Sequence, residues 1–126
     1  MAEKKPNILF LLIDSFNSRN CFGNEKTSIT PNIDSLISNG VYFDQVITCA
    51  STTVPSICGM FTGTYPFNAT VLDGNHYKLN TKIQNFVSIL EKNGYHVKAM
   101  VPDGIKHIRL EKIFHENLDV FNSFST

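Results

Sequence analysis

An unbroken apolar run near the start of the chain most constrains the fold. Residues 7–13 read NILFLLI, and Asp14 and Ser15 end the run abruptly. Continuous apolarity, rather than alternation, is typical of a strand buried on both faces in a parallel sheet. A short buried helix is the alternative interpretation. The run is far shorter than the roughly 20 residues that cross a bilayer, so no membrane-spanning segment is predicted.

Helical and strand patterns alternate along the rest of the chain. Thr30 and Pro31 suit an N-cap and a first helical residue, and Gly94 suits a helix end. Such alternation predicts an α/β fold with a mainly parallel sheet. The expected helices are 31–39, 55–61, 81–93 and 105–118. The expected strands are 7–13, 95–101 and 118–121, and residues 41–43 and 46–47 are β-prone. We expect a turn over 102–104 and loops over 15–29 and 64–80.

Composition limits the class of protein. The chain has 126 residues, which is the size of one domain. Its 11 basic and 11 acidic residues balance, which argues against a nucleic-acid binder or a polybasic membrane-surface module. No signal-peptide core is recognisable, so we expect a cytoplasmic protein. A sheet with so few strands must be covered on both faces, so we expect a larger assembly or a homo-oligomer.

Two polar residues stand where chemistry is expected. Asp14 follows the predicted first strand, at the sheet edge where ligands gather in α/β folds, and a carboxylate there can bind a metal ion. Its other interpretation is a turn residue that caps the strand. Thr53 lies just before the predicted helix that starts at Pro55, where backbone N–H groups favour an anion and a metal-activated hydroxyl can act as nucleophile. Its other interpretation is an ordinary N-cap.

The histidines give a weaker signal. They are His76, His96, His107 and His115, and no two have the spacing of a two-histidine site on a helix. We therefore expect them to be structural or solvent-exposed. His76, near Asp73 and Asn75, is the best candidate among them for a site.

Together these segments resemble a known family. The stretches KPNILFLLIDS, TPNIDSLISNGVYFDQVIT, TTVPSICGMFTGTYP and FVSILEKNGYHVKAM occur in the order and spacing of the amino-terminal part of sulfatases, members of the alkaline-phosphatase superfamily. The resemblance covers residues 5–101. It implies an α/β/α sandwich with a mainly parallel sheet, of which residues 1–126 would be a single, truncated amino-terminal domain.

The resemblance also implies roles for residues. Asp14 occupies the position of the first metal-binding aspartate. Thr53 occupies that of the nucleophile, which also contacts the metal ion. Sulfatases have Cys or Ser there, which is converted to formylglycine within the motif C/S-x-P-x-R. In this chain Thr53 replaces the Cys or Ser, and Ile57 replaces the Arg. No formylglycine is therefore expected. A plain Thr favours a small-molecule phosphate ester over a sulfate ester as substrate, with Zn²⁺, Mn²⁺ or Ca²⁺ as cofactor.

Departures from the family pattern leave an alternative open. Ser15 replaces a second aspartate, and the expected GK-x-H-x-G stretch is absent, with Lys106 and His107 as candidate substitutes. The remaining metal ligands of the family come from its carboxyl-terminal half. The alternative is a non-catalytic remnant that acts as a binding or assembly module. A third hypothesis is that a second chain supplies the missing ligands.

Overall fold

The computed structural model describes residues 5–114 and 117–122, and the chain divides into two compact units. The first unit is Met1–Val46 and the second is Ile47–Thr126. Within the described ranges, no helix has the length and apolar character needed to cross a membrane.

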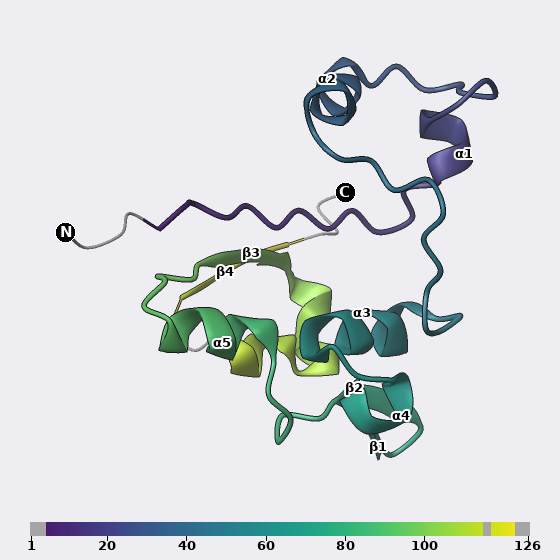
Figure 1. Ribbon diagram of the computed structural model, residues 1–126. Coiled ribbons are helices and arrows are strands. Elements are labelled where there is room, and N and C mark those ends of the chain that lie inside the picture. The colour runs from purple at the N-terminus through teal and green to yellow at the C-terminus, as the bar shows by residue number, and fades with distance from the viewer. Residues whose placement is uncertain (1–4, 115–116, 123–126) are drawn as a thin grey trace. The chain divides into compact units, whose positions relative to one another are not determined.

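The first unit contains two helices, α1 (Ser18–Cys21) and α2 (Pro31–Asn39) (Figure 1). The predicted helix 31–39 is confirmed, with Pro31 as its first residue. Thr30 does not cap it through its side chain; its hydroxyl instead donates to Asp34 at 3.1 Å. Lys26 bonds both carboxylate oxygens of Asp34, at 2.6 and 2.5 Å, and this hydrogen bonding holds the pKa of Asp34 below its usual value.

The predicted strand 7–13 does not form. This segment has no regular secondary structure, and its apolar side chains from Ile8 to Ile13 are 46–88% exposed. A parallel strand needs hydrogen-bonded neighbours and a layer over each face, and no described residue of the first unit supplies a paired strand. The β-prone residues 41–43 and 46–47 also stay irregular for lack of a partner.

The second unit begins with helices and a hairpin. Helix α3 (Thr53–Thr62) is followed by α4 (Pro66–Ala69) and by strands β1 (Thr70–Asp73) and β2 (His76–Leu79), which pair antiparallel. The loop predicted over 64–80 is therefore wrong. Gly74, with φ +60°, and Asn75 form a two-residue turn, and glycine is preferred where such a turn has positive φ.

The rest of the second unit forms a parallel strand pair and short helices. Helix α5 (Phe86–Lys92) is shorter than the predicted 81–93, because Asn85 caps its start. Strands β3 (Ala99–Pro102) and β4 (Leu118–Phe121) pair in parallel, with Ala99 opposite Leu118. This pair confirms the predicted strand at 118–121. Strand β3 begins later in the chain than the strand predicted over 95–101.

The predicted helix 105–118 is replaced by two short 3₁₀ helices, η1 (Asp103–Ile108) and η2 (Leu110–Ile113). Arg109 separates them with φ +65°, a left-handed conformation that a continuous α-helix does not contain. Residues 102–104, expected to form a turn, instead end β3 and begin η1.

One apolar core holds the second unit together. Its most buried members are Cys58 of α3, Leu79 of β2 and Val87 of α5, each at most 1% exposed. Burial raises the pKa of the Cys58 thiol to about 11. The other core residues come from α3, α4 and the segment around η2: Phe61, Ala69, Leu110, Ile113 and Phe114. The core therefore anchors α3 and the hairpin, the two elements that carry the candidate site.

Candidate functional site

The start of α3 determines where Thr53 lies. Thr52 is the N-cap, with extended backbone (φ −125°, ψ 152°), and its carbonyl accepts the Ser56 N–H at 3.2 Å. Pro55 fits this first turn because a proline there has no N–H that needs a partner. Thr53 is therefore the first residue of the helix rather than its cap. Its side chain is exposed.

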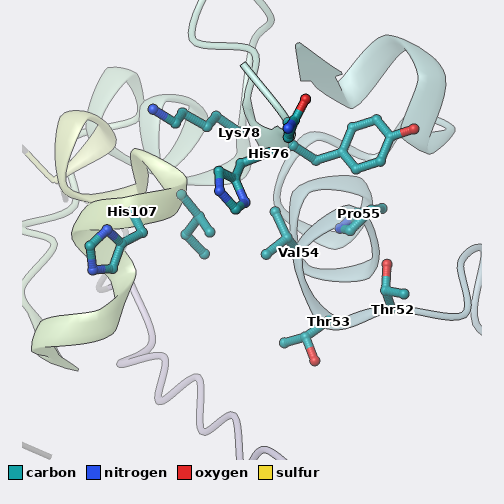
Figure 2. A pocket seen from close by; sticks show the side chains of 10 residues that line it. Thr52, Thr53, Val54, Pro55, His76, Lys78 and His107 are labelled. Atoms are coloured by element: carbon teal, nitrogen blue, oxygen red, sulfur yellow. The ribbon is translucent and has the colours of Figure 1, made fainter. Parts of the chain in front are cut away.

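A pocket of about 440 Å³ opens at this helix start, entirely within the second unit (Figure 2). Residues 52–55 of α3 line it together with residues 75–78 of the hairpin and with His107 and Ile108 of η1. Its volume lies within the roughly 300–1,000 Å³ that is typical of small-molecule sites. The structure thus brings Thr53, His76 and His107 together around one pocket.

A charge network supports the hairpin side of the pocket. Oδ2 of Asp73 accepts a hydrogen bond from Lys78 Nζ and another from Arg109 Nη2, each at 2.7 Å. The bond from Lys78, its charge and the nearby Arg109 hold the pKa of Asp73 below its usual value. The contact to Arg109 joins the hairpin to the segment that carries His107.

Some polar groups of the pocket are free to engage a ligand, whereas Lys78 is bound to Asp73. Among the described residues, neither the imidazoles of His76 and His107 nor the Thr53 hydroxyl has a hydrogen-bond partner. In Figure 2 the Thr53 hydroxyl points away from His76 and Lys78. Attack on a ligand in the pocket would therefore require this unconstrained side chain to rotate.

Asp14 lies in the first unit, and its pairing with Thr53 in one site stays a prediction. One oxygen of its exposed carboxylate accepts the Ser15 N–H at 3.0 Å, in a turn where Ser15 has φ 58°. This local bond matches the interpretation of Asp14 as a turn residue, and it leaves the second carboxylate oxygen available.

The described residues do not assemble a metal site by themselves. In ranges 5–114 and 117–122, no three His, Cys, Asp or Glu side chains are grouped so that they could hold an ion. One carboxylate and one hydroxyl are too few for a divalent cation, which needs about four to six ligands. Asp14 and Thr53 can therefore form only part of a metal centre.

Sequence reasoning found some of the pocket residues and missed others. Lys78 was not anticipated, although Asp-Gly-Asn between β-prone stretches is a hairpin signal that would have placed it on a strand. His96 does not line the pocket. His115 and the side chain of Lys106 lie outside the described part of the chain.

A mixed chain with a parallel strand pair fits the α/β class of folds, and sequence comparisons define the family. The family model described as Sulfatase matches residues 6–122. The chain therefore belongs to the sulfatase family, as its amino-terminal part. This assignment and the parallel β3–β4 pair confirm the predicted alkaline-phosphatase-like α/β class.

Curated relatives support the same assignment. The chain is 33% identical over 114 residues to an ulvan-active sulfatase of Formosa agariphila, covering 89% of this chain and 22% of that protein. It is 33% identical over 99 residues to an N-acetylgalactosamine-6-O-sulfatase of Bacteroides thetaiotaomicron, covering 74% and 19%. It is 33% identical over 106 residues to arylsulfatase H of Homo sapiens, covering 72% and 18%.

The chain thus spans about a fifth of the length of these relatives. No solved structure gives a significant match to it.

Proposed function

We propose that this chain is the part of a sulfatase-family ester hydrolase that carries the nucleophile and one metal ligand. The observation that supports this most is the position of Thr53. It starts helix α3 at the edge of a pocket of small-molecule size, within the residues that match the family, and the sequence resemblance assigns the nucleophile to this position. Residues 1–126 would then be one partial domain of that enzyme. We also propose that the enzyme acts in the cytoplasm.

The chemistry proposed for Thr53 is nucleophilic displacement. Its hydroxyl oxygen attacks the phosphorus or sulfur of the ester, a bond forms between them, and the bond to the alcohol oxygen breaks. The Thr53 proton passes to a base, and the alcohol leaves with a proton. Water then hydrolyses the covalent intermediate and frees Thr53. Backbone N–H groups in the first turn of α3 favour the negative charge of the ester oxygens.

The substrate is proposed to be a small-molecule sulfate or phosphate ester. The names of the relatives cited above are all those of sulfatases, which supports sulfate esters as the broader class. The preference for phosphate esters rests on Thr53, because the resemblance associates formylglycine with Cys or Ser at this position. It also rests on Ser15, which stands where sulfatases often have a second aspartate. We therefore propose a plain threonine nucleophile without formylglycine.

A divalent metal ion, Zn²⁺, Mn²⁺ or Ca²⁺, belongs to this proposal. The described residues do not fit a complete site for it, so most of its ligands would have to come from elsewhere.

The alternative function is a non-catalytic binding or assembly module. The lack of a three-ligand metal group among the described residues favours it, as does the exposed apolar run 8–13. Under this alternative the pocket would bind an ester or another anion without turnover.

The test is an assay of the natural polypeptide that contains these 126 residues. We would measure release of 4-nitrophenol from its phosphate and sulfate esters, with each of the three metal ions. The proposal predicts metal-dependent turnover that Thr53→Ala abolishes, whereas Ser51→Ala, at a nearby exposed hydroxyl that does not line the pocket, retains most of it. Absence of turnover with every metal ion, or turnover retained by Thr53→Ala, would contradict it.

A further inference from the structure

The hairpin side of the pocket carries positive charge. His76 and Lys78 line the pocket from the hairpin, and His107 lines it from η1 (Figure 2). None of the described residues that line the pocket is an aspartate or glutamate. A ligand in this pocket therefore meets cationic or hydrogen-bonding side chains on that side, and no lining carboxylate repels an anion.

The network behind the pocket does not cancel this charge. Lys78 and Arg109 share the single carboxylate of Asp73, through the same oxygen. Two cations and one anion leave a net charge of +1. Because Arg109 also neutralises Asp73, Lys78 can turn one of its three N–H donors toward an anion without leaving the carboxylate unpaired.

The wall also has an apolar part, beside the polar residues Thr52, Asn75 and Tyr77. Val54 and Pro55 of α3 and Ile108 of η1 line the pocket beside the polar groups. Pro55 is buried, and Val54 and Ile108 are half-buried. Together with the volume of about 440 Å³, this suits a ligand with an organic body better than a bare inorganic anion.

We propose that Lys78 and His76 select esters whose organic part carries a second negative charge, such as a carboxylate. This rests on the proposed function, in which the ester group itself lies at Thr53 on helix α3. The hairpin contributes a separate wall, so its Lys78 amine and His76 imidazole are available for a different group of the same molecule. Lys78 is the main ion-pair partner and His76 a hydrogen-bond donor beside it.

The experiment measures binding to the 126-residue chain by NMR titration, without turnover. The probes are 4-carboxyphenyl sulfate, phenyl sulfate and inorganic sulfate. We expect 4-carboxyphenyl sulfate to bind most tightly, with chemical-shift changes at His76 and Lys78. Lys78→Met should weaken its binding about tenfold, the scale of one hydrogen bond to a charged group. Binding of phenyl sulfate should change little, and Lys78→Arg should retain most of the preference.

Two further variants keep the test decisive. Lys82→Met removes the same charge from an exposed residue that does not line the pocket, and it should leave binding unchanged. His76→Gln, at the exposed start of β2, is a second variant in case Lys78→Met fails to fold. It should weaken the binding of 4-carboxyphenyl sulfate by a smaller factor than Lys78→Met. Equal affinity for the two aryl sulfates in the wild-type chain, or equal losses in Lys78→Met and Lys82→Met, would overturn the proposal.

The failure of this inference and that of the proposed function are distinguishable. Turnover together with equal binding of the carboxylated and uncarboxylated esters would contradict only this inference. Selective binding of 4-carboxyphenyl sulfate without any turnover would remove the proposed function alone.

Discussion

At the scale of single residues, Asp73 is the most connected charged group near the pocket. It joins β1 to Lys78 on β2 and to Arg109 between η1 and η2. Arg109 adopts φ +65°, an unfavourable conformation for a non-glycine residue, and its ion pair with Asp73 helps to hold it there. The position of the His107 segment relative to the hairpin therefore depends partly on one carboxylate.

The pKa of Asp73 leads to a pH-dependent prediction. Because Lys78 and Arg109 lower this pKa in the folded chain, Asp73 stabilises the fold above its unfolded pKa, about 3.9. This contribution is lost as the pH falls through the lower folded value. We expect Asp73→Asn to unfold at lower urea concentration than wild type at pH 7, with the difference shrinking as the pH is lowered below 3.9.

The matched control is Asp44→Asn, which removes a carboxylate that has no ion pair among the described residues. It should change the urea midpoint little at either pH. A difference between Asp73→Asn and wild type that is the same at pH 7 and in acid would contradict the assignment.

At the scale of elements, α5 is defined by its first turn. The Asn85 side chain accepts the Ser88 N–H at 3.0 Å, and the Ser88 hydroxyl accepts the Asn85 N–H at 3.4 Å. This reciprocal pair is a capping box, and it satisfies two N–H groups that a helix start otherwise leaves without partners. The next residues, Phe86 and Val87, then place α5 against the core.

We expect Asn85→Ala to destabilise the second unit by about 1 kcal/mol, the usual cost of losing an N-cap. Urea unfolding followed by circular dichroism would measure it. Gln84→Ala, at the exposed neighbouring position, is the control and should change stability by much less. Equal effects of the two substitutions would show that the cap does not stabilise α5.

Local signals explain which elements the sequence alone could predict. Pro31 and Pro55 mark helix starts within one turn, so α2 and α3 were predicted nearly at their true bounds. The prediction of a strand over 7–13 was wrong because a strand needs hydrogen-bonded partner strands, which its own residues do not specify. The hairpin was missed because its strands are only four residues each and their burial does not alternate, since the residues nearest the turn are exposed.

The same reasoning applies to the pocket. Thr53 was identified because a hydroxyl next to a helix start is visible in the sequence and in the family resemblance. Lys78 was not, because its place in the pocket follows from the register of β1 and β2, in which Val71 lies opposite Lys78. The charge network with Arg109, 36 residues from Asp73, depends on tertiary structure and has no local signature.

At the scale of the whole molecule, the exposed apolar run 8–13 is the feature least suited to an isolated chain. Leu9 is 88% exposed and Leu11 is 71% exposed. Contiguous exposed apolar side chains favour association with another chain or segment. We therefore expect the 126-residue chain to self-associate in a concentration-dependent way.

Sedimentation velocity over a range of concentrations would test this. Leu9→Glu combined with Leu11→Glu should shift the chain toward the monomer, whereas Leu72→Glu, at an exposed leucine of β1, should not. A wild-type chain that stays monomeric at every concentration would contradict the prediction. It would also exclude a homo-oligomer as the source of missing metal ligands.

The central claim is that these residues form one part of a metal-dependent ester hydrolase, with Asp14 as a metal ligand. The most direct measurement is a calorimetric titration of the metal-free 126-residue chain with Zn²⁺ and Mn²⁺, repeated with Asp14→Ala. The account predicts weak, millimolar binding to the wild-type chain and weaker or no binding to Asp14→Ala. Tight stoichiometric binding, or equal binding by the two chains, would contradict it.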